Sequence, residues 1–257
     1  MKVQTLKITI WTASLFISLL SFGQGYDKQP LEKMPPALET QYALSALPAH
    51  LRPDATVYLL DPASGYYIAR QGSNGFICFV TRTEWVWEEF RNDIGAAIGY
   101  DPEGARTIFP VYLQVAKMRA SGKYSPVDIR NAILDSLRKG VYKAPSRAGI
   151  SYMLAPVMRT YPGQPDNKTV KTMQMPHYMF YAPYVSASDI GTNQDVWPIL
   201  VNPEEYFLGE KKGPYNYIIM PQGKSEIEEI VKSNQDLLKK LADYKPYFKV
   251  PSDSMHH

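Results

Sequence analysis

Three strand-like runs follow one another between residues 56 and 82, and the short turns between them constrain the fold more than any other feature. The runs, rich in β-branched and aromatic residues, are Thr56–Leu60, Tyr66–Arg70 and Phe76–Arg82. Turn-forming clusters separate them at Asp61–Gly65 and at Gly72–Gly75. Because parallel neighbours need a long crossover connection, the sequence predicts an antiparallel meander.

Two helices are predicted next, as a hairpin. Apolar residues keep helical spacing before Ser121-Gly122, namely Ile108, Val111, Tyr112, Val115 and Ala116, with Pro110 in or near the first turn. Ser125 and Pro126 then open a second helix that ends at Gly140, with Ile129, Ala132, Ile133 and Leu137 as its apolar stripe. The stripes favour packing on a core, and a groove for a partner is the alternative.

The remaining segments complete an α+β prediction. A short helix is expected over Ala37–Leu47, and further strands at Ile150–Leu154, Tyr178–Tyr181 and Tyr215–Met220. The last helix has a capping box formed by Ser225 and Glu228, ends before Pro246, and has an apolar face of Ile227, Ile230, Val231, Leu238 and Leu241. We therefore expect one antiparallel sheet with strands from both halves, packed by the helix hairpin and the C-terminal helix.

The first 24 residues have the pattern of a cleaved secretory signal. Lys2 and Lys7 precede an apolar run from Ile8 to Phe22, which ends in Gly23-Gln24. The run is too short for a comfortable membrane span. We expect a leader over residues 1–24 and a mature domain over residues 25–257, with an extended arm (25–36) and a frayed tail (250–257). The predicted location is periplasmic or extracellular.

Cysteine content and charge exclude several classes. Cys78 is the only cysteine, so no internal disulfide can form, and the predicted cleavage site offers no acceptor for a lipid. The formal net charge is +3, and two of the lysines lie in the leader. We expect no nucleic-acid partner, because phosphate neutralisation needs clustered basic residues. We expect no stable membrane anchor after the leader is removed.

A search for chemistry yields one weak arrangement. Cys78 and His177 could form a nucleophile and base, oriented by Asp189 or Asn74. The alternative is structural, because both faces of Phe76–Val80 are apolar and a buried thiol is inert. No serine elbow, metal-binding pattern or phosphate-binding glycine motif is present, so we expect no metal and no cofactor. The paired acids Glu88-Glu89 and Glu204-Glu205 are predicted to be solvated.

Aromatic residues mark a possible binding surface. Nine tyrosines lie between Tyr142 and Tyr217, with Trp197 among them. Aromatic rings suit sugars, peptides and flat ligands, and the alternative is that they fill a loop-rich core. The candidate ligand-binding residues are Asn74, Tyr152, Tyr178, Tyr181, Asp189 and Trp197.

Four segments carry a resemblance: Asn74–Cys78, Gly149–Leu154, Pro176–Pro183 and Asp189–Gly191. With them the chain resembles a family of secreted bacterial proteins with no assigned activity. The resemblance implies export and a single domain, and it implies no reaction. The segments could converge on one pocket that contains Cys78, Tyr152 and His177.

Two classes of function remain open at this point. The first is an exported, non-catalytic protein of the bacterial envelope that binds a small molecule, a glycan, a peptide or an envelope protein, or serves as a subunit of a larger assembly. The second is a secreted hydrolase or transferase that uses Cys78 and His177. Thiol reactivity separates them, because a nucleophilic cysteine must be accessible and readily ionised.

Overall fold

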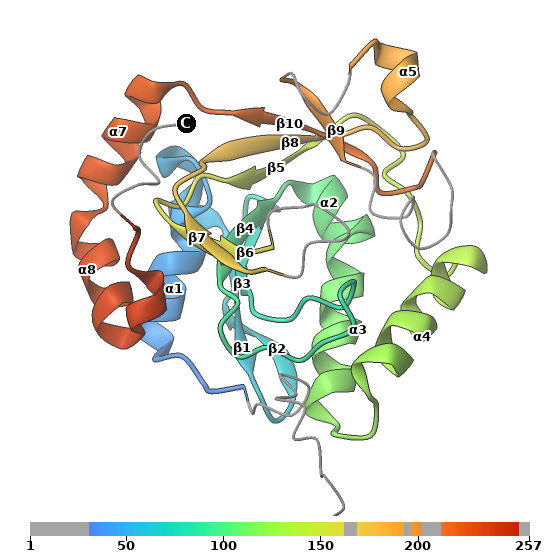
Figure 1. Cartoon of the computed structure of the whole chain (residues 1–257), viewed down its shortest axis with the longest axis horizontal. Helices are drawn as coiled ribbons and strands as arrows, with labels where there is room; N and C mark the ends of the chain where they lie inside the picture. The colour runs from blue at the N-terminus through green and yellow to red at the C-terminus, as the bar shows by residue number, and fades with distance from the viewer. Residues whose placement is uncertain (1–30, 162–168, 193–196, 202–211, 252–257) are drawn as a thin grey trace, which may run out of the picture.

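The computed structural model describes residues 31–161, 169–192, 197–201 and 212–251 (Figure 1). The predicted leader (1–24), the start of the predicted arm (25–30), most of the predicted tail (252–257) and the pair Glu204-Glu205 lie outside these ranges. Residues 31–35 lead into the first helix without regular structure, and Met34 among them is fully buried.

Eight strands form one mostly antiparallel sheet in the order β2-β1-β3-β4-β5-β8-β10-β9. The strands are β1 (Thr56–Asp61), β2 (Gly65–Arg70), β3 (Ile77–Thr81), β4 (Ala96–Tyr100), β5 (Ile150–Met153), β8 (His177–Tyr181), β9 (Ile199–Val201) and β10 (Tyr217–Pro221). A separate antiparallel pair joins β6 (Met158–Thr160) to β7 (Lys171–Met173). Strands from both halves of the sequence therefore share one sheet, and the α+β class predicted from the sequence is confirmed.

The first three strands differ from the predicted meander. β2 pairs with β1 in antiparallel fashion, as expected, but β3 pairs with β1 in parallel and on its other side. Short connections do not exclude this arrangement, because β2 returns the chain to the start of β1. The segment 71–76 needs only to cross the end of one strand, not to run the length of the sheet.

Gly72 makes this crossing possible. A Cβ atom at position 72 would lie 2.2 Å from the Asp54 carbonyl oxygen, so no larger residue fits there. Next along the chain, the Ser73 N–H donates to the same Asp54 carbonyl at 2.8 Å. The turn that seemed to mark a hairpin thus carries the chain across the start of β1.

Helices cover the sheet on both faces (Figure 1). α1 (Pro36–Ser45) lies against β1, β3 and β4, and α8 (Gln235–Tyr244) lies beside α1. α3 (Phe109–Ala120) packs on the opposite face, with α4 (Pro126–Arg138) outside it and α2 (Pro102–Thr107) before it. We call these the α1 face and the α3 face of the sheet. Within the described ranges, no helix combines the length and apolar character that a bilayer crossing requires.

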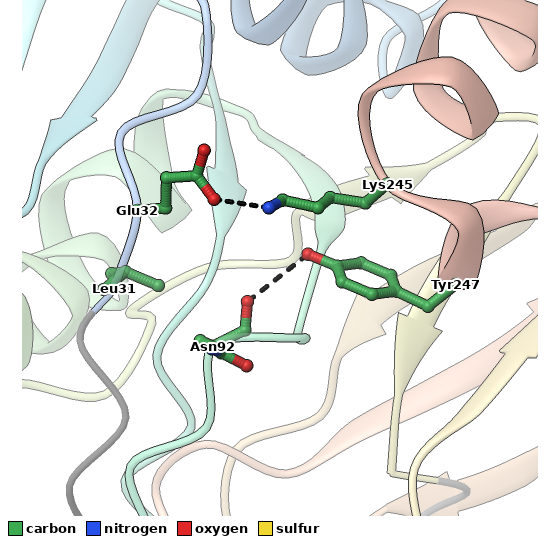
Figure 2. Close-up of a pocket in the computed structure, with 5 residues that line it drawn as sticks. All are labelled: Leu31, Glu32, Asn92, Lys245 and Tyr247. Atoms are coloured by element: carbon green, nitrogen blue, oxygen red, sulfur yellow. Dashed lines mark hydrogen bonds and ion pairs between the residues drawn. The ribbon is translucent and has the colours of Figure 1, made fainter.

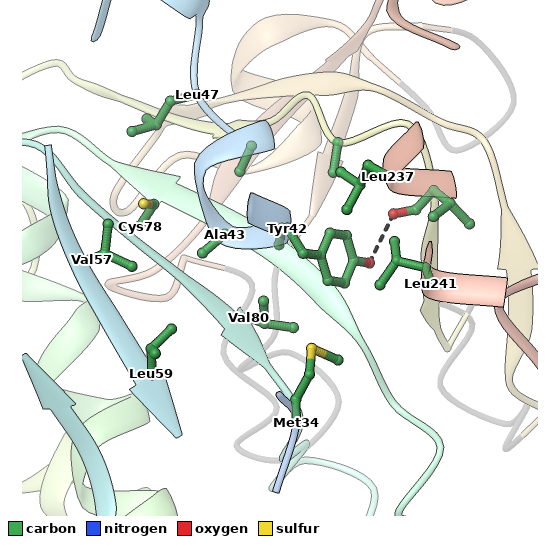
Figure 3. Packing of buried hydrophobic residues seen from close by; sticks show 14 of the residues in the cluster. Met34, Tyr42, Ala43, Leu47, Val57, Leu59, Cys78, Val80, Leu237 and Leu241 are labelled. Carbon is green, nitrogen blue, oxygen red and sulfur yellow. Dashed lines mark hydrogen bonds between the residues drawn. The ribbon is translucent and has the colours of Figure 1, made fainter. Parts of the chain in front are cut away.

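The α1 face is a closely packed apolar core (Figure 3). Leu237 and Leu241 of α8 are buried against Tyr42 of α1, and Val57, Cys78 and Val80 point toward them from the sheet. The Tyr42 hydroxyl donates to the carbonyls of Val157 at 2.8 Å and of Gly95 at 2.9 Å. The Tyr42 hydroxyl is therefore buried with hydrogen-bond partners, as a stable core favours.

The α3 face begins with an aromatic cluster. Phe79 of β3 contacts Phe109 of α3 at a ring distance of 4.8 Å, and Tyr66 and Tyr100 pack around them. Outside this layer, α3 and α4 bury the stripes predicted from the sequence, including Val111, Val115, Ile129, Ile133 and Leu137. The helix pair thus packs on the core.

The C-terminal helix is interrupted, contrary to the prediction. α7 (Lys224–Ser233) begins after Gly223, and the Ser225 side chain bonds to Glu226 at 2.9 Å and does not cap the helix. At Asn234 the backbone leaves the helical region and the side chain donates to the Ile230 carbonyl at 2.7 Å. Leu241 of the predicted stripe is buried, whereas α7 buries none of its residues.

Candidate functional site

A cavity of about 1200 Å³ lies on the α3 face, over strands β4, β5, β8 and β10. Successive side chains along each strand point to opposite faces of the sheet, and those on the α3 face form the floor of the cavity. They include Ile98, Tyr100, Met153, Met179, Tyr181 and Ile219. Ile108, just before α3, and Val111 and Tyr112 of α3 form one wall, and β6, β7 and α7 contribute to the others. Its volume slightly exceeds the range typical of small-molecule sites.

Strand alternation decides which aromatic residues reach this cavity. On β8, the residues His177, Met179 and Tyr181 face the cavity. Tyr178 and Phe180, which lie between them, project to the α1 face, since successive side chains of a strand point to opposite faces. The neighbouring strand follows the same rule, with Ser151 opposite Met179 in register. The sequence Tyr178–Tyr181 therefore serves two surfaces, of which only one belongs to the cavity.

Tyr181 is fixed in the floor by its surroundings. Its hydroxyl lies 3.0 Å from Asp101 Oδ1 and 2.9 Å from the Ile150 carbonyl oxygen. A Cβ at Gly104 would lie 2.1 Å from that hydroxyl, so the ring requires glycine at this position. Burial raises the pKa of Tyr181 far above its usual range, and the Asp101 charge adds to the effect. The residue is a neutral, oriented part of the wall.

The segment 82–95, between β3 and β4, covers part of the cavity with Trp85 and Trp87. The Trp87 ring stacks on Tyr161 at 4.8 Å between centroids. Glu88, whose φ of 56° is positive, forms an ion pair with Arg130 of α4 at 2.7 Å. The segment is thus attached both to the region after β6 and to the helix hairpin.

A second set of charges attaches the end of this segment. Asp93 accepts from Arg91 at 2.7 Å and from Arg159 at 2.6 Å, so one carboxylate joins two cations. Tyr161 donates a short hydrogen bond to Glu89. The prediction that Glu88 and Glu89 are solvated is therefore wrong, because each carboxylate has a partner within the protein.

Glu84 is the exception in this segment. Within the described residues, no hydrogen bond or ion pair involves its carboxylate, and it lines the cavity. Burial raises the pKa of Glu84 to about 7, because a carboxylate with no compensating donor is disfavoured away from water. Burial raises the pKa of Tyr112 of α3 and of Tyr161, and the Glu84 charge raises both further.

His177 contributes a neutral imidazole to the floor. Its Nδ1 lies 2.7 Å from the Met175 carbonyl oxygen. A carbonyl only accepts, so Nδ1 carries the proton and the lone pair is on Nε2. Burial lowers the pKa of His177, which keeps the ring neutral. Chemically, Nε2 is an acceptor for a donor on a bound molecule.

The structure does not bring Cys78 and His177 together. Cys78 projects to the α1 face, where it is fully buried in the core, whereas His177 lines the cavity on the other face. Strands β4 and β5 also separate β3 from β8, a distance of about 14 Å at the usual strand spacing. Burial raises the pKa of the Cys78 thiol to about 12. The hypothesis of a Cys78/His177 pair therefore has no geometric basis.

Four of the predicted ligand-binding residues lie outside the cavity. Tyr152 and Tyr178 contact each other edge to face at 5.7 Å on the α1 face. The Asn74 side chain stabilises the backbone turn in which it lies: it donates to the Leu51 carbonyl at 2.9 Å and accepts from the Phe76 N–H at 3.0 Å. Asp189 caps the short helix α5 (Ala187–Ile190) and pairs with Lys212 at 2.8 Å.

Of the eight predicted site residues, His177, Tyr181 and Trp197 line the cavity. Trp197 is 46% exposed, which places it at the margin. Sequence reasoning missed Glu84, Trp85, Trp87 and Tyr161. The cluster Glu84-Trp-Val-Trp87, two tryptophans beside acids in a segment without a clear periodicity, is the signal that could have indicated them.

A smaller hollow of about 460 Å³ lies between residues 31–32 and the C-terminal turn (Figure 2). Glu32 pairs with Lys245, and the Tyr247 hydroxyl donates to the Asn92 carbonyl at 3.3 Å. Its polar groups thus bind one another, and it offers less to a ligand than the large cavity. No group of three metal-ligating side chains occurs in the described ranges.

Comparisons of this chain with protein-family models, with curated proteins and with solved structures give no match. They therefore assign no family, and the resemblance to secreted bacterial proteins stays a prediction. Any functional conclusion must come from the cavity itself.

Proposed function

We propose that this protein binds a small molecule in the cavity of the α3 face and performs no chemistry on it. The observation that carries the proposal is the combination of volume and lining: about 1200 Å³ lined by aromatic and aliphatic side chains and a few oriented polar groups. His177 and Ser151 provide hydrogen-bonding atoms on the floor, and Glu84 provides a charge on the cover.

The fixed geometry of the floor supports binding. Tyr181 is held by two hydrogen-bond acceptors, and His177 is held by the Met175 carbonyl. Groups that are oriented before a ligand arrives lower the entropic cost of binding. The cover differs, since it is a loop attached at separate points, and such a loop can admit a ligand without disturbing the sheet.

We further propose that binding takes place outside the cytoplasm, in the periplasm or beyond the cell. The support is the leader pattern alone, with Lys2 and Lys7 before an apolar run. N-terminal sequencing of the protein recovered from an exported fraction tests this, and retention of Met1 in the cytosol would overturn it.

A thermal-shift screen tests the binding proposal. The panel contains small aromatic and aliphatic molecules, together with glycans and short peptides. A ligand at a concentration of 100 times its Kd should raise the melting temperature by about 5 °C. Fluorescence of Trp85 and Trp87 should change with the same ligand, because both rings line the cavity.

Two neighbouring substitutions on β8 locate the site. Met179→Trp places a larger side chain in the cavity and should weaken binding by about tenfold or more. Phe180→Trp is the matched control, because Phe180 projects to the opposite face and is 42% exposed. Ile219→Trp repeats the test on β10 in case Met179→Trp does not fold. Equal binding by the cavity variants and the control, or stabilisation by glycans and peptides alone, would contradict the proposal.

A further inference from the structure

Glu84 is the only acid among the described residues that line the cavity. No side chain or backbone group in the described ranges bonds to its carboxylate. The other acids of the same segment differ, because Glu88, Glu89 and Asp93 each have a partner. A carboxylate left without protein donors in a largely apolar cavity costs free energy that a complementary ligand would recover.

Aromatic rings surround this acid. Tyr112 of α3 and Tyr161 both lie close enough for the Glu84 charge to raise their pKa values. Trp87 stacks on Tyr161, and Tyr112 lies 6.3 Å from Tyr100 between ring centroids. Aromatic faces carry negative potential and attract cations, while their area suits an apolar body. Acid and rings therefore favour the same kind of ligand.

The positive groups of the cavity do not compete for Glu84. Among the described residues, the cationic side chains that line it are Arg159, Lys171 and Lys249. Arg159 is bound to Asp93 at 2.6 Å and to the Thr172 hydroxyl at 3.1 Å. Lys171 and Lys249 are exposed to solvent on β7 and near the C-terminal end. Within the described part of the chain, the cavity lining thus leaves no cationic side chain to pair with Glu84, and a bound ligand can supply the positive charge.

We infer that the cavity selects an organic monocation, an amine or quaternary ammonium on a flat or apolar body, with Glu84 as its counter-charge and Trp87, Tyr112 and Tyr161 around it. The inference rests on the proposed function, since it names the ligand class of the same cavity. Inorganic ions do not fit, because the surrounding rings offer few oxygen ligands.

The inference predicts a dependence on pH. Because burial raises the pKa of Glu84 to about 7, the carboxylate is charged above neutrality and mostly protonated in mild acid. Tyr112 and Tyr161 stay neutral throughout this range, because burial raises their pKa values. The charged groups behind Tyr161 are the ion pair between Glu89 and Arg91. Affinity for a cation should therefore rise with pH between about 5.5 and 8.

Matched probes test the charge and not the shape. Tryptamine and tryptophol share an indole body and differ in an ammonium or a hydroxyl. Choline and 3,3-dimethylbutanol form a second such pair. By calorimetry at about pH 8, the cation of each pair should bind about tenfold tighter than its neutral partner. At about pH 5.5 this ratio should fall toward one.

Glu84→Gln keeps the shape of the side chain and removes its charge. It should bring the cation-to-neutral ratio near one at about pH 8, and leave binding of the neutral probe within about twofold. Glu88→Gln is the matched control, because it removes a carboxylate of the same segment that does not line the cavity. That variant should change both members of a pair by the same factor.

The outcomes separate the two proposals. If the neutral probes bind as well as the cations, or if Glu84→Gln keeps the preference for cations, the inference about ligand class is wrong and the binding proposal stands. If no probe of either kind binds, and the wider screen gives no ligand, the proposed function itself is wrong. Tighter binding of neutral probes in acid would show that Glu84 acts as a protonated donor, which also overturns the inference.

Discussion

The two faces of one sheet differ in how they are filled. On the α1 face, Cys78 and Val80 of β3 are packed against α1 and α8 without space for a ligand. On the α3 face, the same sheet carries a tight aromatic cluster at β3 and then a cavity over β5, β8 and β10. Side chains that differ by one position along a strand thus enter a solid core or a hollow site.

The comparison shows where stability and function can be separated. A residue of the packed face contributes through contacts on every side, whereas a residue of the cavity floor lacks some contacts on the side that faces the cavity. Each face also holds an acid whose pKa is raised, the buried Glu39 on α1 and the partly buried Glu84 in the cavity cover. Glu39 accepts a hydrogen bond from the Leu60 N–H at 2.9 Å, whereas Glu84 accepts none within the described residues.

The largest expected effect is on the packed face. Leu241→Ala should lower the free energy of unfolding by about 3 kcal/mol, because Leu241 is fully buried among close neighbours. Met179→Ala should cost less, about 2 kcal/mol, because one side of Met179 already faces the cavity. Urea unfolding measures both values. Equal costs for the two substitutions would show that the cavity is closed in solution, and the comparison of the faces would fail.

The second prediction concerns pH and the two acids. Burial raises the pKa of Glu39 to about 7 from the 4.5 of an exposed carboxyl. The folded protein therefore holds a proton that the unfolded chain releases, and stability falls as pH rises from about 4.5 to 7. Glu39→Gln should reduce the loss of unfolding free energy over this pH range by about 2 kcal/mol, because the amide does not titrate. The amide oxygen can still accept the hydrogen bond from the Leu60 N–H. Unfolding curves at several pH values measure it.

A ligand should distinguish the acids. Addition of a bound organic cation should lower the pKa of Glu84, and leave the pH dependence that Glu39→Gln removes unchanged. Carboxyl signals in NMR titrations report each acid separately. If the ligand shifts the pKa of Glu39 and not that of Glu84, the ligand binds on the α1 face and the proposed site is wrong.

Much of the fold could be predicted from local sequence patterns. Ser125 and Asp128 form the capping box at α4, and the apolar stripes of α3 and α4 are buried. The order of β1, β2 and β3 could not be predicted, because a hairpin and a crossing of one strand end need the same glycine-rich turn. Local spacing does not show which edge of β1 the chain reaches. β4 was missed because Ala96-Ala-Ile-Gly-Tyr100 has little β-branched character.

The site was harder to predict than the fold. Cys78 and His177 drew attention as rare reactive residues, yet the faces of their strands depend on register, which the sequence leaves open. Glu84 and Trp87 lie in an irregular segment, where neither helical nor strand periodicity assigns a direction to a side chain. Their convergence with Tyr112 and Tyr161 is a product of tertiary structure.

A smaller effect is expected from the hydroxyl groups of β8. Tyr181→Phe should lower stability by about 1 kcal/mol, because its hydroxyl bonds to Asp101 and to the Ile150 carbonyl within the protein. Tyr178→Phe, three positions earlier on the other face, should change stability by about 0.3 kcal/mol or less. Thermal unfolding compares the two directly. A larger loss for Tyr178→Phe would mean that the α1 face, and not the cavity floor, depends on hydrogen bonding at this strand.

The smallest expected effect concerns the cover of the cavity. Glu88→Gln breaks the pair with Arg130, whose side chains are 28% and 25% exposed, so global stability should fall by about 0.5 kcal/mol or less. Its effect should instead be local: amide hydrogen exchange in residues 84–90 should speed up while exchange in β3 stays unchanged. Lys239→Met, which breaks an exposed pair on α8, is the control and should alter neither segment. If exchange in β3 rises together with exchange in the cover, the segment opens only when the whole sheet unfolds, and ligand entry needs another route.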